Sequence, residues 1–261
     1  MKYDMAKGVA IKLVSYDETI PKLLRVIRLG SELQKHKQIV IKPFLSQNET
    51  ESTNFALVEN VVKFCVENKA QDSSIFIAEG YDGETEELFE AQGYKKLAEK
   101  YGIGLVDLNR TETIQIGKNE FAGFETIYYP MILKDSFVIS VAPLGGDDKV
   151  LLRGALANML GAYPAKHYKG FFSTRKNKLD SYPIKYQLHD IITVKMPEFA
   201  LIDAKEKGFI LAGQPLEIDK QAAKLLGMDW HNIGYLRMID ETLNEINAKV
   251  EAEKVKNEIK T

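Results

Sequence analysis

The sequence predicts an α/β fold with a mostly parallel sheet and helices on both of its faces. Short apolar runs recur at residues 38–44, 74–78, 104–109 and 137–141, and such runs are typical of strands that are buried on both faces. Segments with helical periodicity separate these runs, and the short connections between them are the pattern of right-handed βαβ units. A length of 261 residues with 45% hydrophobic content is enough for one large core.

Strands and helices alternate through the N-terminal half of the chain. Residues 9–14 predict a strand, and Thr19 and Pro21 predict the start of a helix that continues to about Gln34. After the next strand, a wholly polar loop leads to a second helix. Acidic residues at 84–87 indicate the first turn of a third helix, where negative charge suits the helix dipole.

The C-terminal half is less regular. Residues 111–133 interrupt the alternation and predict a small β excursion. Strands are expected at 199–204 and 209–212, joined by a charged turn, and a C-terminal helix follows. We therefore expect a single α/β domain over residues 1–230, and a C-terminal helix with a charged tail over residues 231–261.

The stretch 137–164 predicts a buried strand, a Gly-rich loop and a helix that ends before Pro164. Asp147 and Asp148 lie in the loop and can cap the helix by accepting backbone N–H bonds. A strand, a Gly-rich turn and a helix N-terminus form a common anion-binding geometry. We therefore expect a small anionic ligand here, with the planar guanidinium of Arg153 as its charge partner. The alternative is a capped connection without a ligand, in which Arg153 pairs with an Asp.

Composition argues against several classes of function. The formal net charge of -2 and the pI of about 6.2 give no support for nucleic-acid binding. The single cysteine, Cys65, lies in an apolar helical pattern and rules out an all-cysteine zinc or iron–sulfur site within the chain. No apolar run reaches the length of a membrane span, and the first residues lack the apolar core of a signal peptide. We expect a cytoplasmic protein with no iron–sulfur cluster and no membrane partner.

Residues 165–190 combine basic and aromatic side chains, which together can follow a single strand of nucleic acid. We interpret this segment as a solvated loop whose aromatic side chains lie against the sheet, because the neighbouring segments carry no matching positive charge. An interaction with RNA or with a protein partner is the alternative interpretation.

Several blocks of the sequence resemble the "domain of unknown function 362" proteins of archaea and bacteria. The blocks occur in the expected order over roughly residues 9–240, and the family has no settled activity that transfers to this chain. They are IVIKPFLS at 39–46, STNFALVENVVKF at 52–64, IAEG at 77–80, GYKKLAEKYGIGLVDLN at 93–109, VISVAP and LANMLGAYP within 138–164, and LAGQPLEIDKQAAKLLGMD at 211–229.

The chain departs from the pattern of these proteins at polar positions. Relatives usually carry Lys-x-Lys-x-His after the central strand, where this chain has Pro143, Gly145 and Asp147. Their Lys-Asn pair is Ala157–Asn158 here, so the Asn alone is kept. Many relatives also have ferredoxin-like cysteine clusters, which this chain lacks. The resemblance therefore implies that any chemistry of the Lys and His residues has been lost or replaced.

Polar residues are expected to gather at the carboxyl ends of the parallel strands, where ligands bind in open sheets. His167 is the histidine best suited to act as a general base near neutral pH. The predicted ligand-binding residues are Lys42, Asp147, Arg153, Asn158 and His167. Several carboxylates at one edge repel one another unless a cation neutralises them, and a divalent ion with oxygen ligands would do so. The predicted ligands of such an ion are Asp107, Asp147 and Asp148.

Three functions are compatible with these patterns. The sequence favours a small-molecule-binding α/β protein whose site lies at the strand ends around residues 143–158. A metal-assisted enzyme of unknown reaction that uses the carboxylate edge is the first alternative. The second is a non-catalytic module that contacts RNA or protein through residues 165–190.

Overall fold

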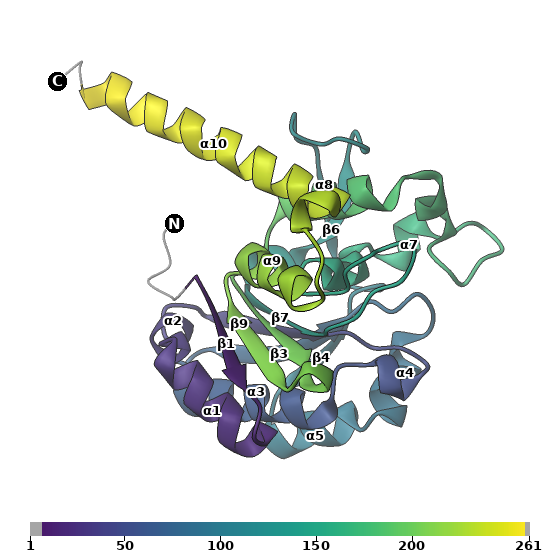
Figure 1. Ribbon diagram of the computed structural model, residues 1–261. Coiled ribbons are helices and arrows are strands. Elements are labelled where there is room, and N and C mark those ends of the chain that lie inside the picture. The colour runs from purple at the N-terminus through teal and green to yellow at the C-terminus, as the bar shows by residue number, and fades with distance from the viewer. Residues whose placement is uncertain (1–6, 259–261) are drawn as a thin grey trace.

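The computed structural model describes residues 7–258, and its mostly parallel sheet confirms the α/β fold. Within these residues the main sheet has seven strands in the order β1-β9-β8-β7-β2-β3-β4. Figure 1 shows this sheet between two groups of helices. The strands from β8 to β4 run parallel, and β9 runs antiparallel to both of its neighbours, β8 and the edge strand β1. The bounds are β1 (Gly8–Lys12), β2 (Gln38–Pro43), β3 (Ser74–Glu79), β4 (Gly104–Asp107), β7 (Phe137–Pro143), β8 (Phe199–Ala204) and β9 (Phe209–Gly213).

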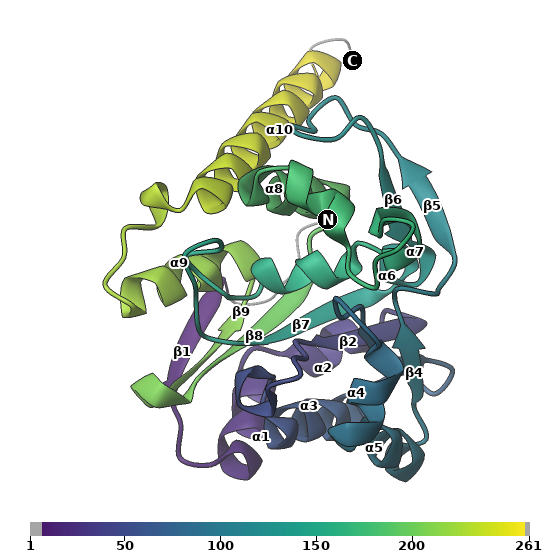
Figure 2. The same ribbon diagram turned by 90° about the vertical axis from the view of Figure 1, so that its right-hand side faces the viewer.

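Helices cover both faces of the sheet (Figure 2). One face is covered by α1 (Tyr16–Val26), α2 (Leu29–Leu33), α3 (Phe55–Asn68), α4 (Thr85–Ala91) and α5 (Tyr94–Tyr101). The core on the other face receives side chains from α6 (Met131–Asp135), α7 (Ala165–Tyr168), α8 (Ile184–Val194), α9 (Pro215–Leu225) and α10 (Gly234–Glu258). Short 3₁₀ helices are η1 (Glu49–Glu51), η2 (Ala157–Ala162), η3 (Asn177–Ser181), η4 (Lys205–Lys207) and η5 (Trp230–Asn232).

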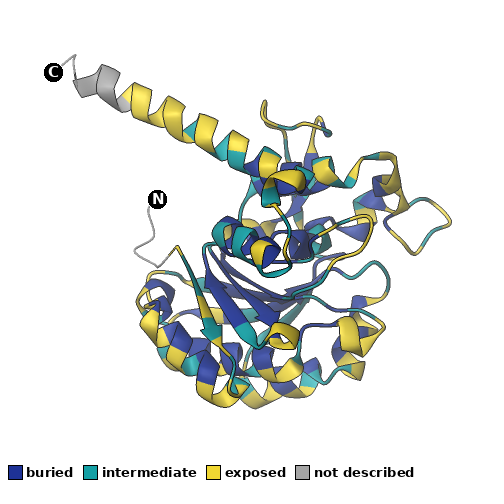
Figure 3. Ribbon diagram, viewed as in Figure 1, coloured by how far each residue is buried: buried dark blue, intermediate teal, exposed yellow. Residues whose placement is uncertain are grey.

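The strands from β9 to β4 contribute side chains to both cores, whereas β1 at the edge contributes to the core formed with α1–α5. In β2, Ile39 and Ile41 face the core formed with α1–α5, whereas Val40 faces the opposite core, because successive side chains of a strand alternate between faces. β7 is buried from Phe137 to Ala142, as predicted for a central parallel strand. Figure 3 shows that burial extends through the middle of the sheet, with exposed residues on the outer sides of the helices.

The predicted β excursion is confirmed. β5 (Thr113–Ile116) and β6 (Ile127–Pro130) pair antiparallel in a separate two-stranded sheet. The two strands expected near residues 200 and 210 also form, as the hairpin β8–β9. Its turn ends at Gly208, whose φ of 78° lies in the left-handed region that glycine adopts without strain.

The helix predicted between residue 148 and Pro164 is wrong for most of its length. After β7 the chain folds back on itself, and Gly145 and Arg153 exchange backbone hydrogen bonds with N–O distances of 3.1 and 2.6 Å. Leu151, with a φ of 58°, lies in the left-handed region, which a long helix does not tolerate. The short helix η2 is the only helical part of this stretch among the described residues.

The physical reason for the missing helix is a side chain of α9, Asp219. The carboxylate of Asp219 accepts hydrogen bonds from the backbone N–H groups of Ala155 (2.7 Å) and Leu156 (3.0 Å). In an α-helix these groups would bond to carbonyls four residues earlier. A Cβ on Gly154 would lie 2.4 Å from Oδ1 of Asp219, so glycine is required at this position. The apolar spacing read as helical therefore reflects burial of an irregular segment, in which Leu152 and Leu156 are fully buried.

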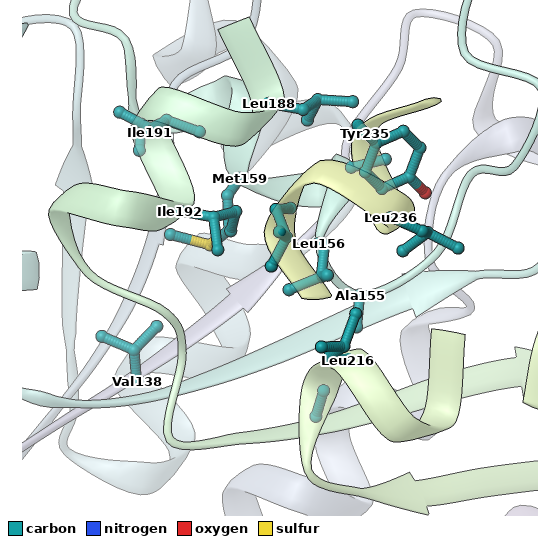
Figure 4. Close-up of a cluster of buried hydrophobic side chains, with 14 of the residues drawn as sticks. Val138, Ala155, Leu156, Met159, Leu188, Ile191, Ile192, Leu216, Tyr235 and Leu236 are labelled. Atoms are coloured by element: carbon teal, nitrogen blue, oxygen red, sulfur yellow. The ribbon is translucent and has the colours of Figure 1, made fainter. Parts of the chain in front are cut away.

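Figure 4 shows how that segment is covered. Leu156 and Met159 pack against Ile191 and Ile192 of α8 and Leu236 of α10. The interpretation of residues 165–190 as one solvated loop is therefore wrong for its second half, which forms α8. Its first half is mostly exposed, and it contains Phe171 and Phe172 with 95% and 98% of their surface accessible.

The C-terminal helix begins in the core and then leaves it. Ile233, Leu236 and Ile239 are buried with α8 and α9, and α10 extends beyond the body of the protein (Figure 1). The charged tail expected at the end of residues 231–261 continues this helix through Glu258, and residues 259–261 lie outside the described residues. Among residues 7–258, no helix has the length and apolar character needed to cross a membrane.

Candidate functional site

A pocket of about 620 Å³ opens at the carboxyl ends of β2 and β3. Its walls come from the start of the loop after β2, the loops after β3 and β7, the helix η2 and the segment that leads from Arg175 into α8. The lining contains equal numbers of basic and acidic side chains, together with several apolar ones. This is the edge of an open parallel sheet at which ligands bind, so we consider this pocket the candidate functional site.

A buried polar network lies beneath the pocket. Nζ of Lys42 donates to both carboxylate oxygens of Glu79, at 3.0 and 2.9 Å, and to Oδ1 of Asn158 at 3.0 Å. The amide of Asn158 donates to the carbonyl of Lys42 (2.8 Å) and to the hydroxyl of Ser140 (3.0 Å). Burial lowers the pKa of Lys42, whereas its contact with Glu79 opposes that shift. The network joins β2, β3 and β7 to η2 and fixes the base of the pocket.

Two glycines allow η2 to approach β3 closely. A Cβ on Gly80 would lie 2.3 Å from the carbonyl oxygen of Gly161, and a Cβ on Gly161 would lie 2.3 Å from Oε1 of Glu79. Distances this short cannot be accommodated, since one clash is with backbone and the other with a fully engaged carboxylate. Glycine at both positions is therefore needed to keep η2 against the strand end.

Lys176 is a second buried lysine in the wall of the pocket. It retains 7% of its surface accessible, and its Nζ donates to the carbonyl of Gly80 at 2.6 Å and to that of Gly161 at 3.5 Å. Its backbone N–H donates to Oδ1 of Asp82 at 2.5 Å, and the guanidinium of Arg175 donates to the other carboxylate oxygen at 3.0 Å. Asp82 thus fixes this segment against the end of β3.

The charge of Lys176 is disfavoured by its surroundings. Burial lowers the pKa of its side chain to about 8, because desolvation penalises the ammonium form. Glu79 and Asp82 oppose this effect, and the positive charge of Lys42 adds to it. A substantial fraction of Lys176 is therefore uncharged in mildly alkaline solution.

Arg153 lines the same pocket with 22% of its side chain accessible. Its guanidinium lies 5.0 Å from the ring centre of Phe44, in cation–π contact, and 3.5 Å from the carboxylate of Asp147. Asp147 accepts backbone hydrogen bonds from Val150 and Lys149, each 2.9 Å long, and these bonds lower its pKa together with Arg153. Asp147 therefore stabilises the loop first, and its contact with Arg153 is longer than a good hydrogen bond.

The predicted ligand-binding residues are divided between three places. Asp147, Arg153 and Asn158 line this pocket, and Lys42 lies directly beneath it. His167 lies elsewhere: its ring stacks on Tyr128 at 3.9 Å, and Nε2 is 3.0 Å from the hydroxyl of Thr113. Burial lowers the pKa of His167, and nearby lysines add to that effect.

The predicted metal ligands do not come together. Asp107 lines a different pocket, of about 320 Å³, and contacts Arg110 at 3.3 Å. Asp148 is exposed in the loop after β7. Within residues 7–258, no group of three or more His, Cys, Asp or Glu side chains is arranged to hold a metal ion.

Sequence reasoning missed the part that Arg175 and Lys176 play in this pocket. Both fall in a run of basic residues, and no local pattern separates the buried Lys176 from its exposed neighbours Lys169 and Lys178. What distinguishes Lys176 is the carbonyl of Gly80, which is distant in sequence. The carboxyl end of β3, where Glu79 lies, belongs to the edge at which polar residues were expected to gather.

Comparison with known proteins supports the resemblance seen in the sequence. A crystal structure of a Thermotoga maritima protein from a structural genomics consortium is similar, with a TM-score of 0.47 and 14% sequence identity. The match covers 80% of this chain and 58% of that one. No curated protein matches the chain. The sequence profile of the domain of unknown function (DUF362) matches residues 39–247, and the chain therefore belongs to this family.

Proposed function

We propose that the protein binds a small organic anion in the pocket at the carboxyl ends of β2 and β3. The observation that carries this proposal is the environment of Lys176. Its buried Nζ contacts backbone carbonyls, and among the described residues no carboxylate lies within ion-pair distance of it. A buried ammonium group without a counter-ion is unfavourable, and a bound anion would supply the missing negative charge.

The acidic residues of the lining support this interpretation because most of them are already engaged. Glu79 is paired with Lys42, and Asp82 is paired with Arg175. Asp147 accepts two backbone hydrogen bonds within its own loop. The negative charge of these groups is therefore largely compensated, and the pocket retains positive charge for a ligand.

Arg153 is the second cation that a ligand can reach. Its only carboxylate contact among the described residues is the 3.5 Å approach to Asp147, so the guanidinium keeps unused donors. A guanidinium suits a carboxylate or phosphate because its donors are arranged in a planar fork. Phe44 supports the guanidinium from one side and holds it at the pocket wall.

Apolar side chains favour an organic anion over a free inorganic ion. Leu160, Leu179, Tyr182 and Ile184 contribute to the lining, and the volume of about 620 Å³ lies in the usual range for small-molecule sites. The ligand class supported best is a carboxylate, or a phosphate ester, that carries an apolar body.

The test is a thermal-shift screen of organic carboxylates and phosphate esters on wild type, Arg153→Met and Arg237→Met. Arg237 is the matched control because it lies on α10 with 55% of its side chain accessible. A ligand at a hundredfold of its Kd adds about 2.7 kcal/mol to the stability of the folded state. We expect at least one anion to stabilise wild type and the Arg237 variant, and to stabilise the Arg153 variant less.

Two results would contradict the proposal. If no anion in the screen raises the melting temperature of wild type, the pocket does not bind this class of ligand. If the same anion stabilises Arg153→Met as much as wild type, the anion binds elsewhere or Arg153 is not its partner.

A further inference from the structure

We propose that Lys176 forms an imine with the carbonyl carbon of a 2-oxo acid, or of a related carboxylate that carries an aldehyde or ketone group. This inference rests on the proposed function, and it adds a substrate class and a covalent step to the same pocket. Its basis is the combination of a buried amine, two backbone acceptors and a separate anion-binding group in one cavity.

The hydrogen bonds of Lys176 suit a neutral amine. A neutral lysine amine has two N–H groups and one lone pair, whereas the ammonium form has three donors and no lone pair. Gly80 and Gly161 offer two carbonyl acceptors to Nζ, at 2.6 and 3.5 Å. One N–H group of the neutral form is therefore held by Gly80, and the carbonyl of Gly161 lies at a longer distance on the side of the other. The lone pair is left for an electrophile in the pocket.

The charges around Lys176 come from several elements. Lys42 of β2 opposes protonation of Lys176, whereas Glu79 of β3, Asp82 of the following loop and Asp107 of β4 favour it. Desolvation outweighs these contributions and brings the pKa to about 8. Lysine nucleophiles are commonly activated in this way, by burial and by a neighbouring cation.

Two other lysines near the pocket are not both desolvated and accessible to a ligand. Lys42 is fully buried, and its Nζ is held by Glu79 and Asn158 beneath the pocket. Lys149 lines the pocket, but it is exposed to solvent rather than buried. Lys176 is therefore the lysine of this site that is both reachable and desolvated.

The carboxylate of a 2-oxo acid also has a partner in the same cavity. Arg153 provides a guanidinium for the carboxylate while Lys176 faces the carbonyl carbon. Tyr81 lies in the lining, and burial together with Asp82 raises its pKa, so its hydroxyl stays protonated and can donate to the carbonyl oxygen. The pocket thus contains a group for each polar part of this substrate class.

The covalent step balances without an oxidant or a reductant. The neutral nitrogen adds to the carbonyl carbon, and the π electrons of the C–O bond move to the oxygen. One proton passes from nitrogen to that oxygen and gives a carbinolamine. The second N–H proton is transferred to the hydroxyl group, which leaves as water when the C–O bond breaks and the C=N bond forms. The sum is one amine and one carbonyl giving one imine and one water. The imine then withdraws electrons from the adjacent carbon, as in other lysine-dependent carbonyl chemistry.

The test is reductive trapping with the full chain. Wild type is incubated with glyoxylate, pyruvate, 2-oxoglutarate or phenylpyruvate in the presence of sodium cyanoborohydride, and adducts are located by peptide mass spectrometry. We expect one dominant adduct on Lys176, with a yield that rises as the pH passes through about 8. The adduct at this position is lost in Lys176→Arg and retained in Lys149→Arg. Because mapping on wild type locates the adduct directly, the conclusion does not depend on the folding of a variant.

The outcomes separate this inference from the proposed function. Lactate, which has the carboxylate of pyruvate but no carbonyl, is tested in parallel by thermal shift. If lactate or pyruvate stabilises the protein and none of the four oxo acids labels Lys176, the imine is overturned and the anion site stands. If adducts spread evenly over exposed lysines, or persist unchanged in Lys176→Arg, the inference is also overturned. If there is neither stabilisation nor labelling, both proposals fail.

Discussion

Lys42 illustrates how one side chain supports the candidate site. Its Nζ donates hydrogen bonds to Glu79 and Asn158, and none of its surface is accessible. Removing one member of such a pair leaves the other charge buried and uncompensated, which costs far more than the pair itself contributes. The network therefore acts mainly as a device that fixes the geometry of β2, β3 and η2.

Lys42→Met is expected to lower the free energy of unfolding by about 3–5 kcal/mol, because it leaves the carboxylate of Glu79 buried without its partner. The double variant Lys42→Met/Glu79→Gln removes that charge and should be less destabilised than the single variant. Urea denaturation measures both. Equal or greater destabilisation of the double variant would contradict this account of the pair.

Asp219 is a carboxylate in an environment that disfavours its charge. It is fully buried and holds the N–H groups of Ala155 and Leu156, and burial raises its pKa to about 7 in spite of these two bonds. A carboxyl group with a raised pKa binds its proton more tightly in the folded state than in the unfolded state. The folded protein is therefore favoured at low pH, and this contribution is lost as the pH rises from the ordinary pKa of Asp towards about 7.

We expect Asp219→Asn to gain stability relative to wild type between about pH 5 and pH 7, by up to about 1.4 kcal/mol per pH unit. Above about pH 7 the difference between the two proteins should stop changing. Chemical denaturation across this range measures the effect, and comparison of the two proteins removes the titration of other groups. A difference that is constant from pH 5 to pH 8 would show that Asp219 is ionised throughout.

At the residue level, the sequence allowed part of the site to be predicted. Lys42 was recognisable because it lies at the end of a parallel strand, and it lies directly beneath the pocket. Arg153 lines the pocket although the helix on which it was predicted does not form, and Asn158 was identified from the resemblance to the family. Lys176 was not recognisable, since its burial depends on carbonyls from distant segments. Residues on regular strands can be placed by periodicity, whereas residues on irregular segments depend on contacts that no local pattern contains.

At the level of elements, the main error concerned the segment after β7. An apolar spacing of three and four residues predicted a helix, yet the chain forms a tight reversal and only the short η2. Periodicity cannot reveal that Asp219 of α9 accepts the hydrogen bonds that the backbone N–H groups of Ala155 and Leu156 would otherwise make within a helix. The consequence is that the candidate pocket is formed by the reversal and η2 rather than by the N-terminus of a long helix.

The loop between α7 and η3 is expected to contribute little to stability. Phe171 and Phe172 contact each other at its tip, with ring centres 4.9 Å apart, and are almost fully exposed. Replacing both by Ala should change the free energy of unfolding by less than about 0.5 kcal/mol. The matched control, Phe199→Ala in β8, should cost about 3–5 kcal/mol because Phe199 is fully buried. Substantial destabilisation of the loop variant in urea would show that these rings pack in solution.

At the level of the whole molecule, the fold could be predicted from the sequence with good accuracy. Ile41, Ile77, Ile139 and Ile202 are fully buried, as their positions in short apolar strands predict. Val106 has the same pattern and was also expected to be buried, but it is only partly buried because β4 lies at the edge of the sheet. The order of the strands could not be read from the pattern, because pairing of β7 with β2 and of β1 with β9 joins segments that are distant in sequence. That order is what brings the ends of β2, β3 and β7 to one pocket.

The central claim is that Lys176 lies in an open pocket in a partly uncharged state, while Lys42 is sealed beneath it. The most direct measurement is competitive labelling of each lysine with acetic anhydride as a function of pH, read by mass spectrometry. Lys176 should be labelled in the folded protein with a midpoint of about pH 8, and Lys42 should stay unlabelled until the protein unfolds. Labelling of Lys176 only at the pH of an ordinary lysine, or protection of Lys176 equal to that of Lys42, would contradict the claim.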